Sequence, residues 1–383
     1  MFRIMHLRMV KMKICYLANA QSVHTQKWVK FFADKGHAVH LISFEKEHIE
    51  NVTVHNLKRP FALRFGLDFP FKLAHARILR RLIRGIDPDI LHAHYLVDYG
   101  LYGALCGFKP FIVTAWGSDV LFVSSEGSRK YFVKKYIAKY VIRKADLVTG
   151  DSSSLVRAVV GLGVDESKVK LIVHGVDLRG FHPVKNNEKF KKDLCIPQDY
   201  CVVISTRNLE PVYDVATLIK AMPYVIDECR NTFFLLVGDG TLRRRLEELA
   251  YKLGVAENVR FVGSVSNREM PKFLGVSDIF VSTSLSDTRS VSLLEAMACG
   301  LPVVVTDLEG NRECVKEGVN GFVFPKRDFK ALAEKIVYLL RNEDARREFG
   351  SANKRYTEEE GNYEKEMGKM EKLYKELVEA YKI

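Results

Sequence analysis

The residues best suited to chemistry lie between Val281 and Thr306, where two acids flank a loop of small and polar side chains. The apolar runs on either side of the loop predict a strand, a helix that ends near Cys299, and a second strand. The first N–H groups of a helix have no partner inside the helix, and the helix dipole favours negative charge at that end. A loop that faces such a terminus predicts an anion site, with Asp287 and Glu295 beside it.

The same stretch also has a purely structural interpretation. Ser292 and Glu295 have the spacing of a capping box, in which Glu295 only accepts a hydrogen bond from the N–H group of the cap residue. Asp287 is then an ordinary loop acid. Because this spacing is common in proteins, the stretch alone leaves both interpretations open.

The chain is long enough for two domains. Its 383 residues exceed the usual limit of one hydrophobic core, and its 47% hydrophobic residues can fill two. No apolar run approaches the roughly 18–20 residues of a membrane span, and the start, MFRIMHLRMVKMK, lacks the apolar core of a signal peptide. Seven scattered cysteines without a C-x-x-C pair suggest neither a zinc site nor disulfides. We therefore expect a cytoplasmic protein without a metal site.

Positive charge is concentrated in the N-terminal half. Residues 1–175 hold 27 lysines and arginines against 14 acids, whereas the remaining residues hold 32 against 33. Such asymmetry attracts an anionic partner, and nucleic acid, anionic lipid headgroups and phosphorylated small molecules all fit. No helix-turn-helix or aromatic RNA-binding signature is present, which argues against nucleic acid.

The first half alternates between predicted strands and helices. Residues 12–18 and 37–43 predict strands on either side of a helix from 26 to 35. The loop after the first strand, Asn19–Thr25, contains no glycine and so lacks the G-x-G-x-x-G pattern of dinucleotide binding, which disfavours NAD and FAD. Further apolar runs predict strands at 90–92, 111–114, 145–148 and 169–173.

Aromatic and polar side chains follow the strands of this half. His92, His94 and Tyr95 end one predicted strand, and Trp116 and Asp119 follow the next one. Ligands of open α/β sheets collect beyond the carboxyl ends of the strands. These residues are therefore candidates for ligand contact.

Two stretches, 71–84 and 129–144, are both amphipathic and basic. They predict surface helices that pack on a sheet and expose solvated basic faces. The alternative is docking on an anionic membrane surface. Four aromatic residues would then lie at the membrane interface: Phe71, Tyr131, Phe132 and Tyr136.

A second alternating series follows a polar stretch, Asn186–Lys192, which we interpret as a linker. Its predicted strands include 201–205, 232–237 and 259–262. The stretch NGFVFP (320–325) comes later, and a charged helical tail follows Ser351. The expected fold class is therefore α/β, with two Rossmann-like, doubly wound domains facing a central cleft.

Six motifs occur in the order found in a known family. They are ADLVTGDS (145–152), HGVDLRGF (174–181), VGDGTLRRRLEELA (237–250), FVGSV (261–265), SDTRSVSLLEAMACGLPVV (286–304) and NGFVFP (320–325). Over roughly residues 12–365 the chain resembles the retaining glycosyltransferases of GT-B type, family four, also called group 1. The resemblance implies an acceptor-binding domain (1–178), a nucleotide-sugar-binding domain (179–361) and a terminal helix (about 362–383) that packs on the first domain.

The resemblance also implies roles for the opening stretch. Glu295 matches the second acid of an E-x7-E motif, which binds the nucleotide ribose, and Asp287 takes the place of the first, near the donor sugar hydroxyls. The ligand role of Glu295 is therefore favoured over the capping box. The backbone amides of Thr288, Arg289 and Ser290 would contact the diphosphate and the sugar. Val265 would contact the base through backbone groups, and Gly238 would allow close approach of the nucleotide.

The family usually has an Arg and a Lys that neutralise the departing diphosphate. Here Arg207 remains, but Tyr213 or Asp214 falls near the place of the Lys. That leaves Arg207, the helix N-terminus and Arg312 to carry the charge of the leaving group.

The acceptor side departs from the family pattern as well. Trp116 stands where the family often has a His that reaches the sugar, which suggests a different or a stacked sugar. Asn19–Thr25 replaces the usual Gly-Gly loop, and Asn19 and His24 are candidates for acceptor contact. Asp119 is a candidate for orienting the reacting groups.

The predicted function is metal-independent, retaining transfer of a sugar from a nucleotide sugar, used as co-substrate, to an acceptor hydroxyl. The basic N-terminal domain fits a lipid-phosphate-linked acceptor in polysaccharide or glycolipid assembly, with the protein peripheral on the inner face of a membrane. Two alternatives stay open: a nucleotide-sugar epimerase of the same two-lobed fold, and a non-catalytic protein that binds sugar nucleotides or nucleic acid.

Overall fold

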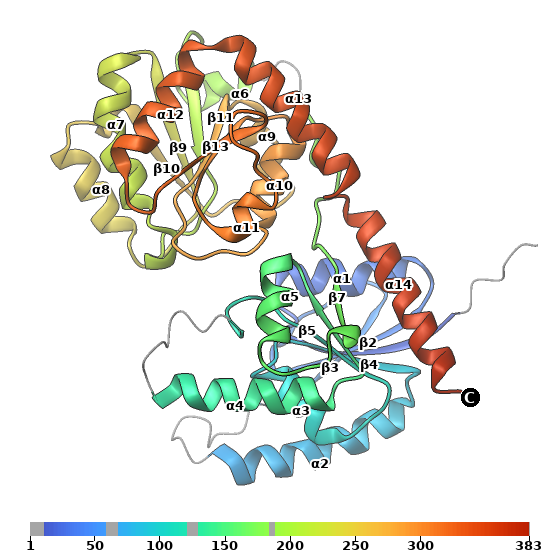
Figure 1. Ribbon diagram of the computed structural model, residues 1–383. Helices are drawn as coiled ribbons and strands as arrows, with labels where there is room; N and C mark the ends of the chain where they lie inside the picture. The colour runs from blue at the N-terminus through green and yellow to red at the C-terminus, as the bar shows by residue number, and fades with distance from the viewer. Residues whose placement is uncertain (1–10, 59–67, 121–128, 184–187, 383) are drawn as a thin grey trace, which may run out of the picture. The chain divides into compact units, whose positions relative to one another are not determined.

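The computed structural model describes residues 11–58, 68–120, 129–183 and 188–382, without the side chains of 68–74 and 129–130. Contacts divide the chain into two compact units. One comprises the chain up to Ile172 together with the segment from Met367 onward, and the other is Val173–Glu366. The domain boundary expected from the sequence, after residue 178, lies a few residues beyond this division between Ile172 and Val173. Each unit is a parallel sheet with helices on both faces (Figure 1).

The first unit contains, among its described residues, a seven-stranded sheet in the order β3-β2-β1-β4-β5-β6-β7. Its strands are β1 (Lys13–Leu17), β2 (Ala38–Ser43), β3 (Val52–Asn56), β4 (Ile90–His94), β5 (Phe111–Thr114), β6 (Leu147–Gly150) and β7 (Val169–Leu171). Its helices are α1 (Val23–Asp34), α2 (Asp68–Ile86), α3 (Tyr99–Cys106), α4 (Arg129–Lys144), α5 (Ser153–Val160) and most of α14 (Tyr363–Ala380).

The second unit has six described strands, in the order β10-β9-β8-β11-β12-β13. They are β8 (Cys201–Ser205), β9 (Thr232–Val237), β10 (Val259–Gly263), β11 (Ile279–Ser282), β12 (Val303–Thr306) and β13 (Gly321–Phe324). The helices are α6 (Glu188–Asp193), α7 (Val215–Glu228), α8 (Arg243–Lys252), α9 (Met270–Gly275), α10 (Val291–Ala298), α11 (Glu309–Arg312), α12 (Phe329–Arg341) and α13 (Glu343–Glu359). The two-domain, doubly wound α/β class predicted from the sequence is confirmed.

In each sheet an aspartate just before one strand binds the backbone of the neighbouring strand near its amino end. The Asp89 carboxylate, just before β4, accepts a hydrogen bond from the Lys13 backbone N–H at 2.7 Å. Asp278, before β11, does the same for Val202 of β8, also at 2.7 Å. An N–H group near the start of a strand needs a partner when it is buried, so these contacts help to fix the register of neighbouring strands.

Two expected boundaries were wrong. Helix α1 begins at Val23 rather than near residue 26, because the Ser22 hydroxyl accepts a hydrogen bond from the Thr25 N–H at 3.5 Å and caps an earlier turn. His24 therefore lies in the first helical turn rather than in a loop. In the expected linker, residues Glu188–Asp193 form helix α6, since Phe190 packs edge-on against Phe273, with 5.0 Å between ring centroids.

A buried polar network attaches α14 to the first sheet. The Tyr374 hydroxyl lies 2.5 Å from Nδ1 of His92 and 3.0 Å from the Tyr16 hydroxyl, and it accepts a hydrogen bond from Trp28 Nε1 at 3.4 Å. His92 Nε2 lies 2.7 Å from the Thr114 hydroxyl. Burial lowers the pKa of His92 to about 3. His92, expected at the ligand edge, is therefore a neutral structural residue.

Candidate active site

Helix α10 presents its N-terminus to the loop that carries Asp287. The cap residue is Ser290, whose backbone is extended. Glu295 lies five positions beyond this cap, too far to bond back to its N–H group, so the capping-box interpretation is wrong. Glu295 is 6% exposed and accepts a hydrogen bond from Asn267 Nδ2 at 3.1 Å. It is a buried acid held by the loop that follows β10.

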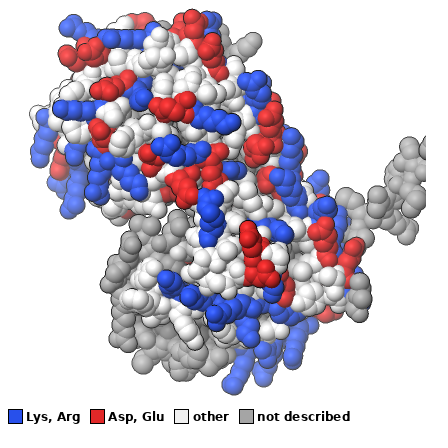
Figure 2. Space-filling model, viewed as in Figure 1, with Lys and Arg blue, Asp and Glu red and all other residues white. Residues whose placement is uncertain are grey.

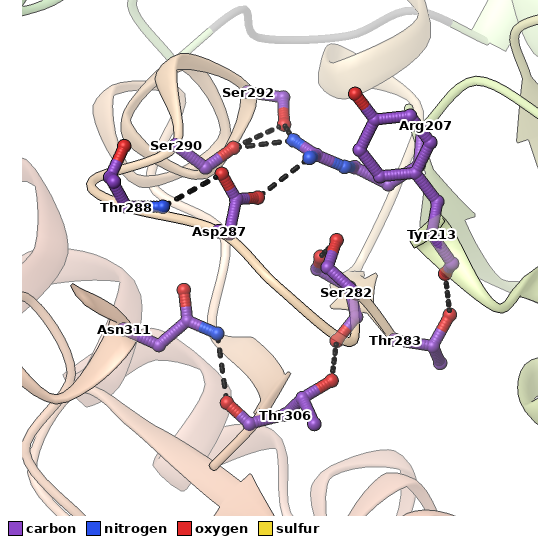
Figure 3. Close-up of polar contacts among 11 residues, drawn as sticks. Arg207, Tyr213, Ser282, Thr283, Asp287, Thr288, Ser290, Ser292, Thr306 and Asn311 are labelled. Atoms are coloured by element: carbon purple, nitrogen blue, oxygen red, sulfur yellow. Dashed lines mark hydrogen bonds and ion pairs between the residues drawn. The ribbon is translucent and has the colours of Figure 1, made fainter. Parts of the chain in front are cut away.

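Arg207 stands at this helix terminus (Figure 3). Its Nη2 donates to Asp287 Oδ2 at 2.6 Å, and its Nη1 donates to the hydroxyls of Ser290 at 2.5 Å and Ser292 at 2.7 Å. The second Asp287 oxygen accepts from the Thr288 N–H at 3.1 Å. The guanidinium and the carboxylate are 10% and 16% exposed. A largely buried cation is thus fixed where a helix also favours negative charge.

Tyr213 covers one face of this cation. Its ring centroid lies 4.3 Å from the guanidinium carbon of Arg207, within cation–π range. The Thr283 hydroxyl donates to the Tyr213 carbonyl at 2.8 Å and fixes the tyrosine backbone. Asp214 has a left-handed backbone, with φ of 44°, and its carboxylate accepts from the Thr217 hydroxyl at 2.6 Å. Of the two residues near the expected Lys, Tyr213 therefore supports Arg207, while Asp214 starts helix α7.

Gly238 is required by the backbone that carries Arg207. A Cβ at this position would lie 2.5 Å from the Arg207 carbonyl oxygen, and the φ of 145° disfavours other residues. Its N–H donates to the Gly263 carbonyl at 2.9 Å. Val265, two residues further on, is half-buried against the core. Gly238 and Val265 therefore lie at the ends of adjacent strands, and their nucleotide contacts stay predictions.

The two other predicted donor-side arginines have acidic partners. Arg289 pairs with Glu313 at 3.1 Å, and both side chains are nearly buried. Arg312 pairs through two nitrogens with Asp307, at 2.5 and 2.7 Å, on a more exposed surface. The role predicted for Arg289 uses its backbone and is unaffected. The role predicted for Arg312 stays a prediction, although its charge is already balanced by Asp307.

Trp116 is the centre of an aromatic cluster in the first unit. Tyr95 stacks on it, with 5.6 Å between centroids and 12° between ring planes. His24 and His94 each lie 5.3 Å from the Trp116 ring. The predicted acceptor residues Trp116 and His24 are therefore brought together. Asn19 makes a local turn, in which its side-chain oxygen accepts from the Gln21 N–H at 2.8 Å.

Asp119 holds backbone rather than ligand groups. Its two oxygens accept hydrogen bonds from the N–H groups of Trp116, at 2.9 Å, and Leu96, at 2.7 Å. The residue is 2% exposed, and burial raises its pKa to about 6. Asp119 therefore joins the loops that follow β4 and β5, and the reactive role predicted for it has no direct support in this geometry.

The sequence reasoning did not identify three supporting residues. The spacing of Ser292 indicates only a helix cap, no motif marks Asn267, and Tyr213 stands out only as a residue near the place of the family's Lys. Each lies just beyond the carboxyl end of a strand or in the following helix turn, which was the available signal. Their partners are distant in the chain, so the contacts themselves had no sequence signal.

Some classes of site have no counterpart in the described ranges. No group of three or more His, Cys, Asp or Glu side chains in these ranges is arranged to hold a metal ion. Nor does any helix there combine the length and the apolar character needed to cross a membrane.

Two parallel-sheet α/β units of this kind define the GT-B glycosyltransferase fold. HepE from Anabaena, solved in complex with UDP, matches with a TM-score of 0.80 over 96% of this chain and 100% of that chain, at 19% identity. The family model for glycosyl transferases group 1 matches residues 186–356, and a glycosyl transferase 4-like model matches residues 13–152. The chain belongs to the group 1 glycosyltransferases, which confirms the resemblance.

Curated relatives agree with this assignment. N-acetyl-alpha-D-glucosaminyl L-malate synthase from Bacillus anthracis is 25% identical over 359 residues, covering 91% of this chain and 92% of the relative. UDP-Gal:alpha-D-GlcNAc-diphosphoundecaprenol alpha-1,3-galactosyltransferase from Escherichia coli is 28% identical over 272 residues, covering 68% of each protein. The chain is therefore a glycosyltransferase.

Proposed function

We propose that the protein transfers a sugar from a nucleotide-sugar donor to an acceptor hydroxyl, with retention and without a metal ion, in glycan or glycolipid biosynthesis. The observation that carries the proposal is the buried Arg207, held at the N-terminus of α10 by Asp287 and two serine hydroxyls. Retention and metal independence follow the family resemblance.

The chemistry needs fixed positive charge beside the leaving group. When the sugar–phosphate bond breaks, a nucleoside diphosphate departs and negative charge develops on its oxygens. A guanidinium that is only 10% exposed, next to a helix N-terminus, stabilises that charge more than it would in water. Arg207 is therefore the residue that assists departure.

Asp287 and Glu295 bind different parts of the donor. In the chain described here Asp287 balances the charge of Arg207. An incoming diphosphate competes for that guanidinium, and this exchange releases the Asp287 carboxylate toward the hydroxyls of the donor sugar. Glu295, oriented by Asn267, binds the ribose hydroxyls with its carboxylate.

The names of similar proteins support this choice of substrates. HepE was solved with UDP, and the Escherichia coli relative is named for a UDP-galactose donor and a diphosphoundecaprenol-linked acceptor. We infer a nucleotide-sugar donor for this chain and, from the excess of basic residues in its first half, a lipid-phosphate-linked acceptor.

Helix α4 offers a surface for an anionic membrane. Phe132, Val133 and Tyr136 are 67%, 53% and 76% exposed on this helix. Lys and Arg side chains gather over α2 and α4 (Figure 2). Tyr131 instead packs against the core, and the side chain of Phe71 lies outside the described residues. Three exposed apolar side chains beside basic ones match an interfacial helix, and we propose that α4 docks the enzyme on anionic lipid.

A thermal-shift screen over nucleotide sugars tests the donor proposal. A bound donor raises the melting temperature, because it binds only the folded state. We expect one donor to stabilise the wild type and Glu295→Gln to lose that shift while folding normally. Donor-dependent transfer onto a lipid-linked acceptor would support the enzyme. Epimer formed from the donor alone would identify an epimerase, and binding without turnover over an acceptor panel would identify a non-catalytic protein.

Sedimentation with vesicles tests the membrane proposal. We expect binding to phosphatidylglycerol vesicles that weakens at high salt, and little binding to phosphatidylcholine vesicles. The double variant Phe132→Ser, Tyr136→Ser should lose sedimentation. Tyr251→Ser is the matched control, since Tyr251 is 79% exposed on α8 of the second unit. Equal sedimentation of both variants would contradict a role for α4.

A further inference from the structure

Three consecutive residues at the end of β8 carry buried polar atoms that have no hydrogen-bond partner among the described residues. The atoms are Ser205 Oγ, Thr206 Oγ1 and Arg207 Nε. An unpaired buried polar group is destabilising, and native structures contain few of them. Three in succession at a strand end are therefore a feature that calls for a ligand.

The chemistry of these atoms selects the class of ligand. Arg207 Nε can only donate, and hydroxyl groups can also donate. Before a ligand binds, the other two guanidinium nitrogens donate to Asp287, Ser290 and Ser292, and Tyr213 covers a face, so Nε is the nitrogen with no partner to exchange. The remaining donors therefore fit a ligand that offers several acceptor oxygens and carries negative charge, which describes a phosphate group.

The place of these residues in the fold is that of a ligand site. Strand β8 lies between β9 and β11, and the chain builds the sheet outward from it in both directions. In open α/β sheets ligands bind beyond the carboxyl ends of the strands at such a switch point. Ser205 is only 2% exposed, whereas Thr206 is partly exposed as a residue, although its Oγ1 atom is itself buried. Of the two residues, Thr206 is therefore the better placed to meet a ligand.

We propose that Thr206 is a ligand of the donor diphosphate, whose oxygens accept hydrogen bonds from its hydroxyl and from Arg207 Nε. The inference rests on the proposed function and deepens it, because it names a binding residue that neither the motifs nor the comparisons assign. A neutral donor at this position adds a contact to the phosphates beside Arg207, where Tyr213 or Asp214 stands near the place of the family's Lys.

The test compares two substitutions of Thr206. Binding of UDP, GDP and ADP is measured by calorimetry, and the tightest ligand of the wild type is then used with each variant. Thr206→Val keeps the shape but removes the hydroxyl, and we expect it to weaken binding about 10-fold or more, since hydrogen bonds to charged groups are strong. Thr206→Ser keeps the hydroxyl and should bind within about threefold of the wild type.

A stability measurement separates binding from structure. The Thr206 hydroxyl has no partner in the described chain, so Thr206→Val should melt at or above the wild-type temperature. Thr232→Val is the control: its hydroxyl donates to the Cys229 carbonyl at 2.6 Å, at the opposite end of a neighbouring strand. That variant should lose stability and keep its affinity.

The possible results distinguish failure of the Thr206 inference from failure of the proposed function. Equal affinity of Thr206→Val and the wild type would overturn the inference and leave the proposed function standing. Loss of binding together with a lowered melting temperature would make the hydroxyl structural and also overturn it. A wild type that binds none of the three nucleoside diphosphates, nor any nucleotide sugar, would overturn the proposed function and the inference together.

Discussion

Both sheets place an aspartate beyond their carboxyl ends, but the two aspartates have different partners. Asp287 pairs with the side chain of Arg207 and is 16% exposed. Asp119 accepts hydrogen bonds from two backbone N–H groups and is 2% exposed. A carboxylate paired with a side chain can exchange that partner for a ligand, whereas one bound to two loop backbones can leave them only if both loops rearrange. Position at a sheet edge therefore does not by itself make an acid reactive.

The aromatic residues at the two edges differ in the same way. In the first unit Tyr95 stacks on Trp116, a contact between neutral rings. In the second unit Tyr213 stacks on the guanidinium of Arg207. The first edge offers aromatic surface, and the second edge offers directed positive charge. This contrast fits an acceptor side and a diphosphate side, and four experiments probe it.

Removing the cation should have the largest effect. We expect Arg207→Ala to lower kcat/KM for transfer about 100- to 1000-fold, the range seen when a fixed electrostatic contact to developing charge is lost. Arg312→Ala should change it by less than about twofold, because exposed ion pairs such as Arg312–Asp307 contribute little. Steady-state transfer assays compare the two. A similar loss of kcat/KM in both variants would support the donor-site role that the sequence predicted for Arg312.

The buried network of the first unit should act on stability through pH. The folded pKa of His92, about 3, lies below its unfolded value of 6.5, so the unfolded chain binds more protons between these values. The His92 contribution is therefore complete above pH 6.5 and is lost as the pH falls, by a few kcal/mol near pH 4.

Urea titrations of the wild type and His92→Gln at pH 7 and pH 4 isolate this contribution. The variant should be less stable at pH 7 and should lose less stability between the two pH values. Parallel losses in both proteins would show that His92 does not titrate on unfolding in this range.

Asp119 should affect stability and not donor binding. In Asp119→Asn one carboxylate oxygen becomes an NH2 group, which cannot accept from a backbone N–H group. We expect a loss of about 1–3 kcal/mol in the free energy of unfolding, with nucleotide binding unchanged. Denaturant titration and calorimetry measure the two quantities. A fully stable variant with slow transfer would instead support the orienting role predicted from the sequence.

The smallest expected effect is the one that tests exchange at Arg207. Asp287→Asn removes the charge that competes for the guanidinium, so a nucleoside diphosphate should bind a few-fold more tightly, as expected when a charged hydrogen-bond acceptor becomes neutral. Transfer should nevertheless slow, because the sugar loses a carboxylate contact. Calorimetry and initial rates give both values, and weaker nucleotide binding would show that Asp287 does not compete for Arg207.

The class of fold and the general place of the site could be predicted from the sequence. Apolar runs of strand length between amphipathic stretches predicted two parallel sheets, and the 129–144 stretch became α4 with unchanged bounds. Six motifs in order were enough for the family. The residues beyond the carboxyl ends of the strands were the right ones to inspect, because such ends collect ligands.

Which of those residues are available for chemistry depends on contacts that form only in the folded protein. His92 meets Tyr374, and Arg207 meets Asp287, across separations of 282 and 80 residues, which local periodicity does not encode. Whether Glu295 could be a cap depended on where α10 begins, and that depends on how loop 283–290 packs. The sequence is enough to select Asp287, Asp119 and Arg207 as candidates. Burial and long-range hydrogen bonds show that Asp287 can exchange its partner, whereas Asp119 holds two loops together.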